Sequence, residues 1–395
     1  MPMDGGGSKN QTRIRLFACI VIFSLISTGV RGGRSTLQTE EDSQILTEDF
    51  SDSEKFSDST EFQAEEVRKV PREVYTLGSK IADWDEQRAK WLQENPGTSF
   101  NRKGKPRMIL ASSSQSEPCP SAAGDHYLMK FLKNKMDYAR LHDLDMYYNM
   151  VVFEERMKGF FIKLPLVRKL ILTHPEAEWI WWMDSDALFT DMSFEIPFEK
   201  YKDYNMIVHG WAGEVYHNKN WLGLNAGIFL LRNCQWSLDF LDLWAAMGAD
   251  IAHNREEVGA LLSKELLGRP DDFLVDDQSA LIYLLSISHT EELKAKVFLE
   301  HSYDLHGYWV MAMELHEAKF NDTPMGRLAR HDWSFITHFV GCKTCSGSFA
   351  SYGMDKCLET MERAYNLADN QVLRSYGYEH EDLSSSNVAP TRPVD

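Results

Sequence analysis

The chain has 395 residues, of which 43% are hydrophobic and 26% charged, and its formal net charge is −17 at pH 7. This composition is too apolar for a disordered chain, and the length suffices for one large domain or two modest ones. The acidic balance and the lack of a long Lys/Arg block argue against nucleic-acid binding, which depends on neutralising phosphates.

The amino-terminal residues predict entry into the secretory pathway. Residues 16–30 (LFACIVIFSLISTGV) form an apolar run that follows Lys9, Arg13 and Arg15. The length of the run suits either a signal-anchor transmembrane segment or a cleaved signal peptide. The positive flank favours an anchor, with residues 1–15 as a cytoplasmic tail. We therefore expect a single-pass type II membrane protein whose remaining residues lie in a lumen.

An acidic stalk is expected over residues 31–68. Within it, residues 40–66 contain eleven acidic side chains and one basic side chain, and their few apolar residues are scattered. Such a segment cannot offset its ordering entropy by burial, although a fraying acidic helix is an alternative. We expect one folded domain over residues 69–382 and a loose carboxyl-terminal tail over residues 383–395.

Within the domain, short apolar runs alternate with helical patterns. The runs predict strands over 108–111, 146–153, 178–183, 205–210, 223–231, 297–300 and 335–340. The helical patterns cover 126–144, 158–173, 234–247, 256–267 and 277–287. The first helix is expected to bury Tyr127, Phe131, Leu132, Tyr138 and Leu141. This alternation predicts one three-layer α/β domain with a mainly parallel sheet.

A lumenal location has two chemical consequences. Cysteines there can oxidise, and Cys342 and Cys345 form a CxxC pair with Cys357 nearby. Half of a zinc site is one interpretation, but no second CxxC is present, so a local disulfide that includes Cys357 is favoured. Five cysteines follow the apolar run, which leaves at least one free thiol. Asn321, in an Asn-Asp-Thr sequon, is the expected glycosylation site.

The most informative motif is a pair of carboxylates at the end of an apolar strand. The segment Trp179-Ile-Trp-Trp-Met ends in Asp184 and Asp186, which are separated by one residue. Open α/β sheets bind ligands at the carboxyl ends of their strands. Oxygen ligands suit Mg²⁺ or Mn²⁺, and such an ion can hold a nucleotide diphosphate. A helix cap plus a surface acid is the alternative, but the apolar strand favours a metal site.

A second acidic motif, Asp276-Asp277-Gln278, opens a predicted helix. One of its acids can simply cap that helix. In the functional interpretation, a carboxylate and an amide lie beside the reacting carbon, orient a sugar hydroxyl and stabilise positive charge in the transition state. The aromatic residues available to hold a glycan acceptor are Trp211, Tyr216, Trp221, Tyr308 and Trp309.

A third motif, at residues 337–343, combines three residue types that suit a phosphate and metal site. His338 ends a predicted strand, where a neutral imidazole can complete a metal shell. Gly341 permits close approach of the backbone, and Lys343 can reach a diphosphate. A lone histidine is usually structural, so its interpretation as a ligand depends on this glycine and lysine.

Several long motifs together resemble glycosyltransferase family 34 of plants. They are WWMDSDALFTD, GLNAGIFLLRNCQWSLDFLDLW at 223–244, VDDQSALIYLL at 275–285, LHGYW at 305–309, THFVGC at 337–342 and ADNQVL at 368–373. This family includes xyloglucan α-1,6-xylosyltransferases and galactomannan α-1,6-galactosyltransferases. The resemblance implies a GT-A type nucleotide-sugar-binding fold, a Golgi type II topology, Mn²⁺, a UDP-sugar donor and retention of the anomeric configuration.

The resemblance also implies roles for individual residues. Mn²⁺ would be held by Asp184, Asp186 and His338, and the catalytic residues would be Asp276, Asp277 and Gln278. The donor would be bound by Ser113, Lys163, Ser185, His306, Gly341 and Lys343. Members of the family are thought to use a front-face mechanism, in which the leaving phosphate helps to deprotonate the incoming hydroxyl. No covalent nucleophile is then required.

The favoured function is transfer of xylose from UDP-xylose in α-1,6 linkage onto a β-1,4-glucan chain in the Golgi. Transfer of galactose from UDP-galactose onto a β-1,4-mannan is the alternative. A non-catalytic scaffold of a polysaccharide synthase complex is a third reading, and homo- or hetero-oligomers with related transferases are the expected protein partners. A haloacid-dehalogenase-type phosphatase is disfavoured, because it needs Thr or Val where Leu188 stands.

Overall fold

The structure is a computed structural model that describes residues 75–251, 253–313, 334–345 and 352–391. The chain divides into two units, residues 1–68 and residues 69–395, and all of the described residues belong to the second. The expected anchor, the acidic stalk and the sequon at Asn321 all lie outside the described residues. In the described part, no helix is both long and apolar enough to cross a membrane.

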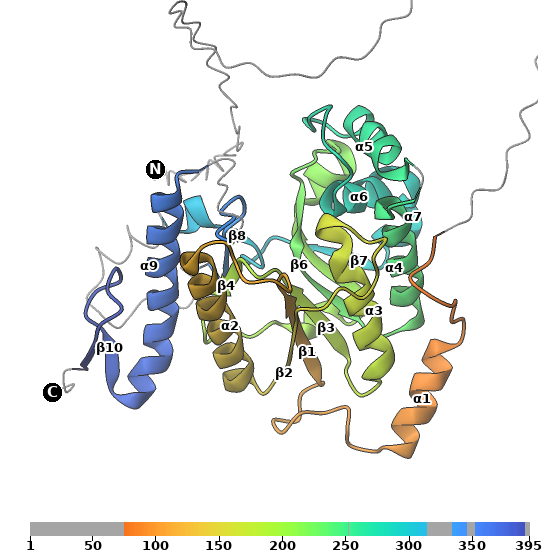
Figure 1. The fold of residues 1–395 in the computed structure, drawn as a ribbon. Coiled ribbons are helices and arrows are strands. Elements are labelled where there is room, and N and C mark those ends of the chain that lie inside the picture. Colours follow the sequence, from red (N-terminus) through yellow and green to blue (C-terminus); the bar gives the residue numbers. More distant parts are fainter. Residues whose placement is uncertain (1–74, 252, 314–333, 346–351, 392–395) are drawn as a thin grey trace, which may run out of the picture. The chain divides into compact units, whose positions relative to one another are not determined.

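A six-stranded sheet forms the centre of the second unit, in the order β2-β1-β3-β6-β5-β7 (Figure 1). Its strands are β1 (Met108–Ser113), β2 (Asp145–Asn149), β3 (Trp179–Met183), β5 (Met206–Gly210), β6 (Leu224–Arg232) and β7 (Val297–Glu300). All neighbouring pairs are parallel except those that include β6, which runs antiparallel to β3 and to β5. The prediction of an α/β fold with a mainly parallel sheet is therefore confirmed.

Apart from the partly exposed edge strand β2, the sheet is buried on both faces, which explains why most of its strands are continuous apolar runs. Along β3, Ile180 and Trp182 pack into one core, whereas Trp179, Trp181 and Met183 pack into the other. The first core is completed by α3 (Lys163–Thr173), α4 (Gln235–Gly248) and α6 (Asp277–Tyr283). The second is completed by α2 (Ala122–His142) and α9 (Met354–Leu373). Figure 1 shows α3 and α4 on one side of the sheet and α2 and α9 on the other.

A second sheet has three strands in the order β4-β9-β8. Its strands are β4 (Ala187–Phe189), β8 (Gly307–Tyr308) and β9 (Ile336–His338). The remaining helices are α1 (Trp84–Glu94), α5 (Asn254–Glu265) and α7 (Thr290–Lys294). Short 3₁₀ turns cover Gly159–Ile162, Phe198–Tyr201 and Arg374–Tyr376, and single π-helical turns cover Gly213–His217 and Leu284–Ser288.

Several boundaries differ from the sequence-based prediction for local reasons. Helix α2 begins early, because the Ser121 side chain accepts a hydrogen bond from the Gly124 N–H at 3.2 Å. It ends before Asp143, which has a left-handed backbone with φ of 57°. The predicted strand 146–153 stops at Asn149, where its pairing with β1 ends. Leu141, expected inside, is exposed.

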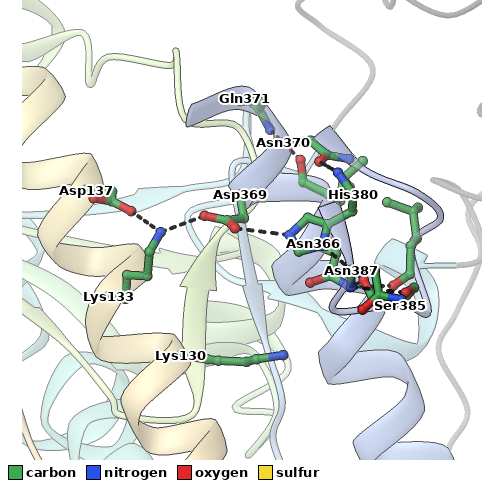
Figure 2. Close-up of polar contacts among 12 residues, drawn as sticks. Lys130, Lys133, Asp137, Asn366, Asp369, Asn370, Gln371, His380, Ser385 and Asn387 are labelled. Atoms are coloured by element: carbon green, nitrogen blue, oxygen red, sulfur yellow. Dashed lines mark hydrogen bonds and ion pairs between the residues drawn. The ribbon is translucent and has the colours of Figure 1, made fainter. Parts of the chain in front are cut away.

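The sequence predicts a loose tail over residues 383–395. In the structure, part of this segment is instead held against the domain. Strand β11 (Val388–Pro390) pairs with β10 (Tyr378–His380), and the Asn366 side chain donates to the Leu383 carbonyl at 3.0 Å. In Figure 2, Lys133 of α2 lies between Asp137 and Asp369, at 2.7 and 2.6 Å. His380 joins the same network through Asp369, at 3.0 Å. These polar contacts tie α2, α9 and the β10-β11 hairpin together.

Candidate metal and nucleotide site

The two sheets bring the DxD segment and His338 together from 152 positions apart in the chain. Strand β3 ends at Met183, and the next N–H, that of Asp184, donates to the Gly227 carbonyl of β6 at 2.9 Å. The chain then enters β4, where Ala187 pairs with His338 of β9. One ligand atom each of Asp184, Asp186 and His338 lies within 4.8 Å of the others. Two carboxylates and one imidazole at this spacing fit a divalent cation.

Neighbouring residues fix the orientation of the three side chains. The Trp182 indole N–H donates to Asp184 Oδ1 at 2.6 Å, and His338 Nε2 lies 3.1 Å from Asp186 Oδ1. Gly227 faces the same group. A Cβ atom at this position would lie 2.4 Å from His338 Cε1 and 2.8 Å from Asp184 Oδ2. Glycine is therefore required here for space, because any larger side chain would overlap His338 and Asp184.

A buried lysine links the DxD motif to the second acidic motif. Lys163, the first residue of α3, is 3% exposed, and its ammonium lies 2.7 Å from Asp277 Oδ2 and 3.5 Å from Asp184 Oδ1. It also donates to the Ala226 carbonyl at 2.8 Å. Burial raises the pKa of Asp277 to about 6, and the Lys163 cation opposes this rise. Burial works against the charge of Lys163, but Asp184 and Asp277 keep its pKa above the ordinary value.

The two acids of the second motif are used differently. Asp276 accepts the Ser279 N–H at 2.7 Å as the N-cap of α6, and it pairs with the buried Arg269 at 3.1 Å. The capping interpretation considered for this motif therefore applies to Asp276. Gln278 accepts from the Asn225 amide at 3.2 Å and donates to the Trp221 carbonyl at 3.0 Å, so both ends of its amide are held.

A cavity of about 430 Å³ opens beside the DxD motif, within the range usual for small-molecule sites. Six of the expected residues line it: Ser113, Lys163, Asp184, Ser185, Asp186 and Lys343. The cavity wall also includes Phe160 and Gln115, which the sequence had not singled out. Phe160 is exposed at the rim. Asp276, Asp277, Gln278, His306, His338 and Gly341 are not among the lining residues.

Two disulfides hold the wall that carries Lys343. Cys342 is bonded to Cys357 of α9, and Cys345 is bonded to Cys119. The expected local disulfide with Cys357 is thereby confirmed, and the zinc interpretation of the CxxC pair is wrong. Cys234 is the free cysteine in the described part of the chain.

Gly341, which precedes Cys342, has a φ of 87°, a left-handed conformation that favours glycine. The sequence predicts that a glycine here lets the backbone approach a ligand closely. The structure shows a second reason for glycine, the left-handed backbone conformation at this position. A Cβ atom here would also lie 3.0 Å from the ring of Tyr352.

The aromatic residues considered for an acceptor fall into two groups. Trp309 is fully buried and stacks on Phe339, so it belongs to the core. Trp211, which directly follows β5, is 48% exposed. Tyr216, Trp221 and Tyr308 are partly buried.

Sequence reasoning missed the roles of Trp182, Gly227 and Asn225, which orient or make room for the expected site residues. All three lie inside motifs that had been singled out. Their roles depend on which side chains of other strands they face, and the spacing of residues along the sequence does not predict such contacts.

A group of side chains that could hold a divalent cation, beside a cavity of this size, is typical of proteins that bind phosphorylated ligands through a metal ion. Comparison with known proteins narrows this class. Residues 104–348 match the galactosyl transferase GMA12/MNN10 family. The chain therefore belongs to this glycosyltransferase family, as its motifs had indicated.

Named relatives are similar over most of the chain. Xyloglucan 6-xylosyltransferase 1 of Arabidopsis thaliana is 51% identical over 83% of this chain and 70% of its own length. Xyloglucan 6-xylosyltransferase 2 of the same plant is 50% identical, over 84% and 71%. Probable xyloglucan 6-xylosyltransferase 1 of Oryza sativa subsp. indica is 52% identical, over 80% and 70%.

Among solved structures, a glycosyltransferase involved in glycosylation of the major capsid of PBCV-1 is 13% identical, with a TM-score of 0.38. The alignment covers 65% of this chain and 99% of that one. A TM-score below 0.5 is too low to support a conclusion about the fold.

Proposed function

We propose that this protein is a retaining xyloglucan 6-xylosyltransferase, which moves xylose from UDP-xylose onto a β-1,4-glucan chain. The observation that carries the proposal is the cluster of Asp184, Asp186 and His338, whose two carboxylates line a cavity together with Lys163 and Lys343. The names of relatives about half identical over more than 80% of the chain support the choice of xylose and glucan. A Golgi location with a type II anchor is part of the proposal.

The metal ion in this proposal is Mn²⁺, held by Asp184, Asp186 and His338. The donor set fits a divalent ion, and Gly227 leaves open the space that an added Cβ would fill. When bound, the ion would neutralise charge on the diphosphate as it leaves. Lys343, which also lines the cavity, would add a positive charge for the same diphosphate.

The Lys163–Asp277 pair suits electrostatic stabilisation better than covalent catalysis. The Asp277 carboxylate is buried and 2.7 Å from an ammonium group, which weakens it as a nucleophile. Its negative charge would instead favour the positive charge that develops on the sugar carbon as the bond to the phosphate breaks. The acceptor hydroxyl attacks the sugar carbon from the face that the phosphate leaves. It gives its proton to the leaving phosphate, so that UDP and the xylosylated glucan are the products. This is the front-face route that the family resemblance implies.

The alternative donor, UDP-galactose with a mannan acceptor, draws support from the description of the matched family as galactosyl transferases. Galactose carries a hydroxymethyl group that xylose lacks, and a pocket that merely leaves room for it discriminates by only about 1–3 kcal/mol, or roughly 10–200-fold. Xylose remains the proposed donor, because the relatives compared above carry xylosyltransferase names.

The experiment compares both reactions in the purified protein with Mn²⁺ present. We expect transfer from UDP-xylose to cello-oligosaccharides to be faster than transfer from UDP-galactose to manno-oligosaccharides. The reverse ranking would replace the proposed function with its alternative. No transfer from either donor would leave the scaffold reading, with homo- or hetero-oligomers of related transferases as the partners to test.

One variant tests the metal-binding role of the DxD motif. Asp186→Ala should abolish transfer while the protein stays folded, because this carboxylate lies at the cavity and not in the core. Asp203→Ala, at an exposed acid outside the cavity, is the matched control and should keep the wild-type rate. Wild-type transfer by Asp186→Ala would refute the assignment of the metal site.

A further inference from the structure

We infer that His306 is a positioning residue that fixes the tautomer of His338, so that His338 presents a lone pair to the metal ion. The inference rests on the proposed function, because it concerns the same metal site. It differs from the role that the family resemblance implied for His306, which was contact with the donor.

Each nitrogen of the His338 ring has one neighbour. Nε2 lies 3.1 Å from Asp186 Oδ1, and Nδ1 lies 2.9 Å from Nδ1 of His306. The rings of the two histidines are perpendicular, with centroids 4.9 Å apart. His338 itself is 3% exposed, so the protein and not water provides its hydrogen-bond partners.

A hydrogen bond between two imidazole nitrogens needs one N–H and one lone pair. If His338 binds the cation through Nε2, its single proton must be on Nδ1. That proton is then donated to Nδ1 of His306, whose own proton is on Nε2. In the opposite tautomer of His338, the proton would lie on Nε2, next to Asp186, and would block the lone pair that the metal requires.

Among the described residues, the contacts of His306 lead to His338 and His209 and not to the cavity. His306 does not line the cavity; it precedes β8, whose Tyr308 pairs in register with His338. Its second aromatic neighbour is His209, with ring centroids 5.5 Å apart. His306 therefore acts on the site through His338, in the way that partners behind a metal ligand commonly set its orientation and basicity.

The test measures binding of Mn²⁺ alone to the full-length protein, by titration calorimetry and by the electron paramagnetic resonance signal of free Mn²⁺. His306→Asn keeps a polar acceptor close to the place of Nδ1, whereas His306→Gln moves it to the place of Nε2. We expect His306→Asn to keep affinity close to that of the wild type. We expect His306→Gln and His306→Leu to bind Mn²⁺ about 10–100-fold more weakly, the usual effect of removing a partner behind a metal ligand.

His209→Leu is the matched control, because His209 is a buried histidine beside His306 that has no hydrogen bond to His338. It should bind Mn²⁺ like the wild type. The thermal unfolding midpoint of each variant without metal separates loss of the ligand from loss of the fold. If His306→Leu does not fold, the comparison of Asn with Gln still decides the question.

Wild-type affinity in His306→Gln, or equal weakening in the Asn and Gln variants, would overturn the inference. Absence of Mn²⁺ binding in the wild type would instead refute the proposed metal site. The two failures are therefore distinguishable by the wild-type titration alone.

Discussion

Replacing Gly227 by alanine should damage the metal site more than the fold. The added Cβ would lie 2.4 Å from His338 Cε1, 2.8 Å from Asp184 Oδ2 and 3.1 Å from Asn225 Oδ1. Non-bonded heavy atoms normally approach only to about 3.5–4.0 Å. One methyl group therefore overlaps two of the three proposed ligands at once.

The clash has to be relieved by the ligands and not by the strand. Gly227 lies in β6 at a bulge in the pairing with β5, but its carbonyl accepts from the Asp184 N–H at 2.9 Å and its N–H donates to Asn225 Oδ1 at 2.9 Å, so its backbone cannot shift freely. The buried His338 ring or the Asp184 carboxylate must move instead. Overpacking of this kind costs about 1–3 kcal/mol, which corresponds to roughly 5- to 150-fold weaker binding if the cost falls on the metal complex.

The assay is Mn²⁺ titration of Gly227→Ala, together with thermal unfolding in the absence of metal. Gly213→Ala is the control, since an added Cβ there meets nothing within 4 Å. We expect the control to match the wild type in both measurements. If Gly227→Ala binds Mn²⁺ and transfers sugar like the wild type, the geometry of this site is not the one that the protein uses.

Two further predictions concern the Lys163–Asp277 pair and the disulfide of Cys357. The pKa of Asp277 is raised to about 6, and its carboxylate form is the active one, so kcat/KM should rise as the pH increases through about 6. Lys163→Met removes the nearby cation and should therefore shift this rise in kcat/KM to higher pH. A flat pH profile would contradict the role of Asp277. Asp277 binds its proton more tightly in the folded state than in the unfolded state, so the free energy of unfolding should decrease as the pH rises from about 4 to about 6. This decrease should be absent in Asp277→Asn. Cys357→Ser opens a bridge across 15 positions and should lower the free energy of unfolding by about 3 kcal/mol in urea titrations. Unchanged stability would mean that the bridge to Cys342 does not constrain the chain.

The sequence alone was enough to predict the layered α/β architecture and the place of the DxD motif. Strands buried on both faces are continuous apolar runs, and such runs are visible without any knowledge of their neighbours. Asp184 and Asp186 directly follow one of these runs, so their position at a strand end was also local information. The chain order of the motifs was sufficient to suggest the family.

Helix α2 shows where reading by hydrophobic periodicity fails. Leu141 is 46% exposed, whereas Asn134 and Lys135 are buried. The Lys135 ammonium donates to the Ala187 carbonyl at 2.6 Å, and the Asn134 amide donates to the Phe189 carbonyl at 2.9 Å. Both polar side chains are satisfied by the backbone of β4, which offsets the cost of their burial. A count of apolar residues cannot foresee partners that lie about 50 positions away.

Only the tertiary structure separated the roles of neighbouring residues. Asp276 and Asp277 are adjacent, yet one caps α6 while the other forms a buried ion pair with Lys163. Likewise, His338 meets the DxD segment only because β9 pairs with β4. Local patterns specify elements, since they depend on neighbours in sequence. Partners are decided by which elements pack together, and that depends on the whole chain at once.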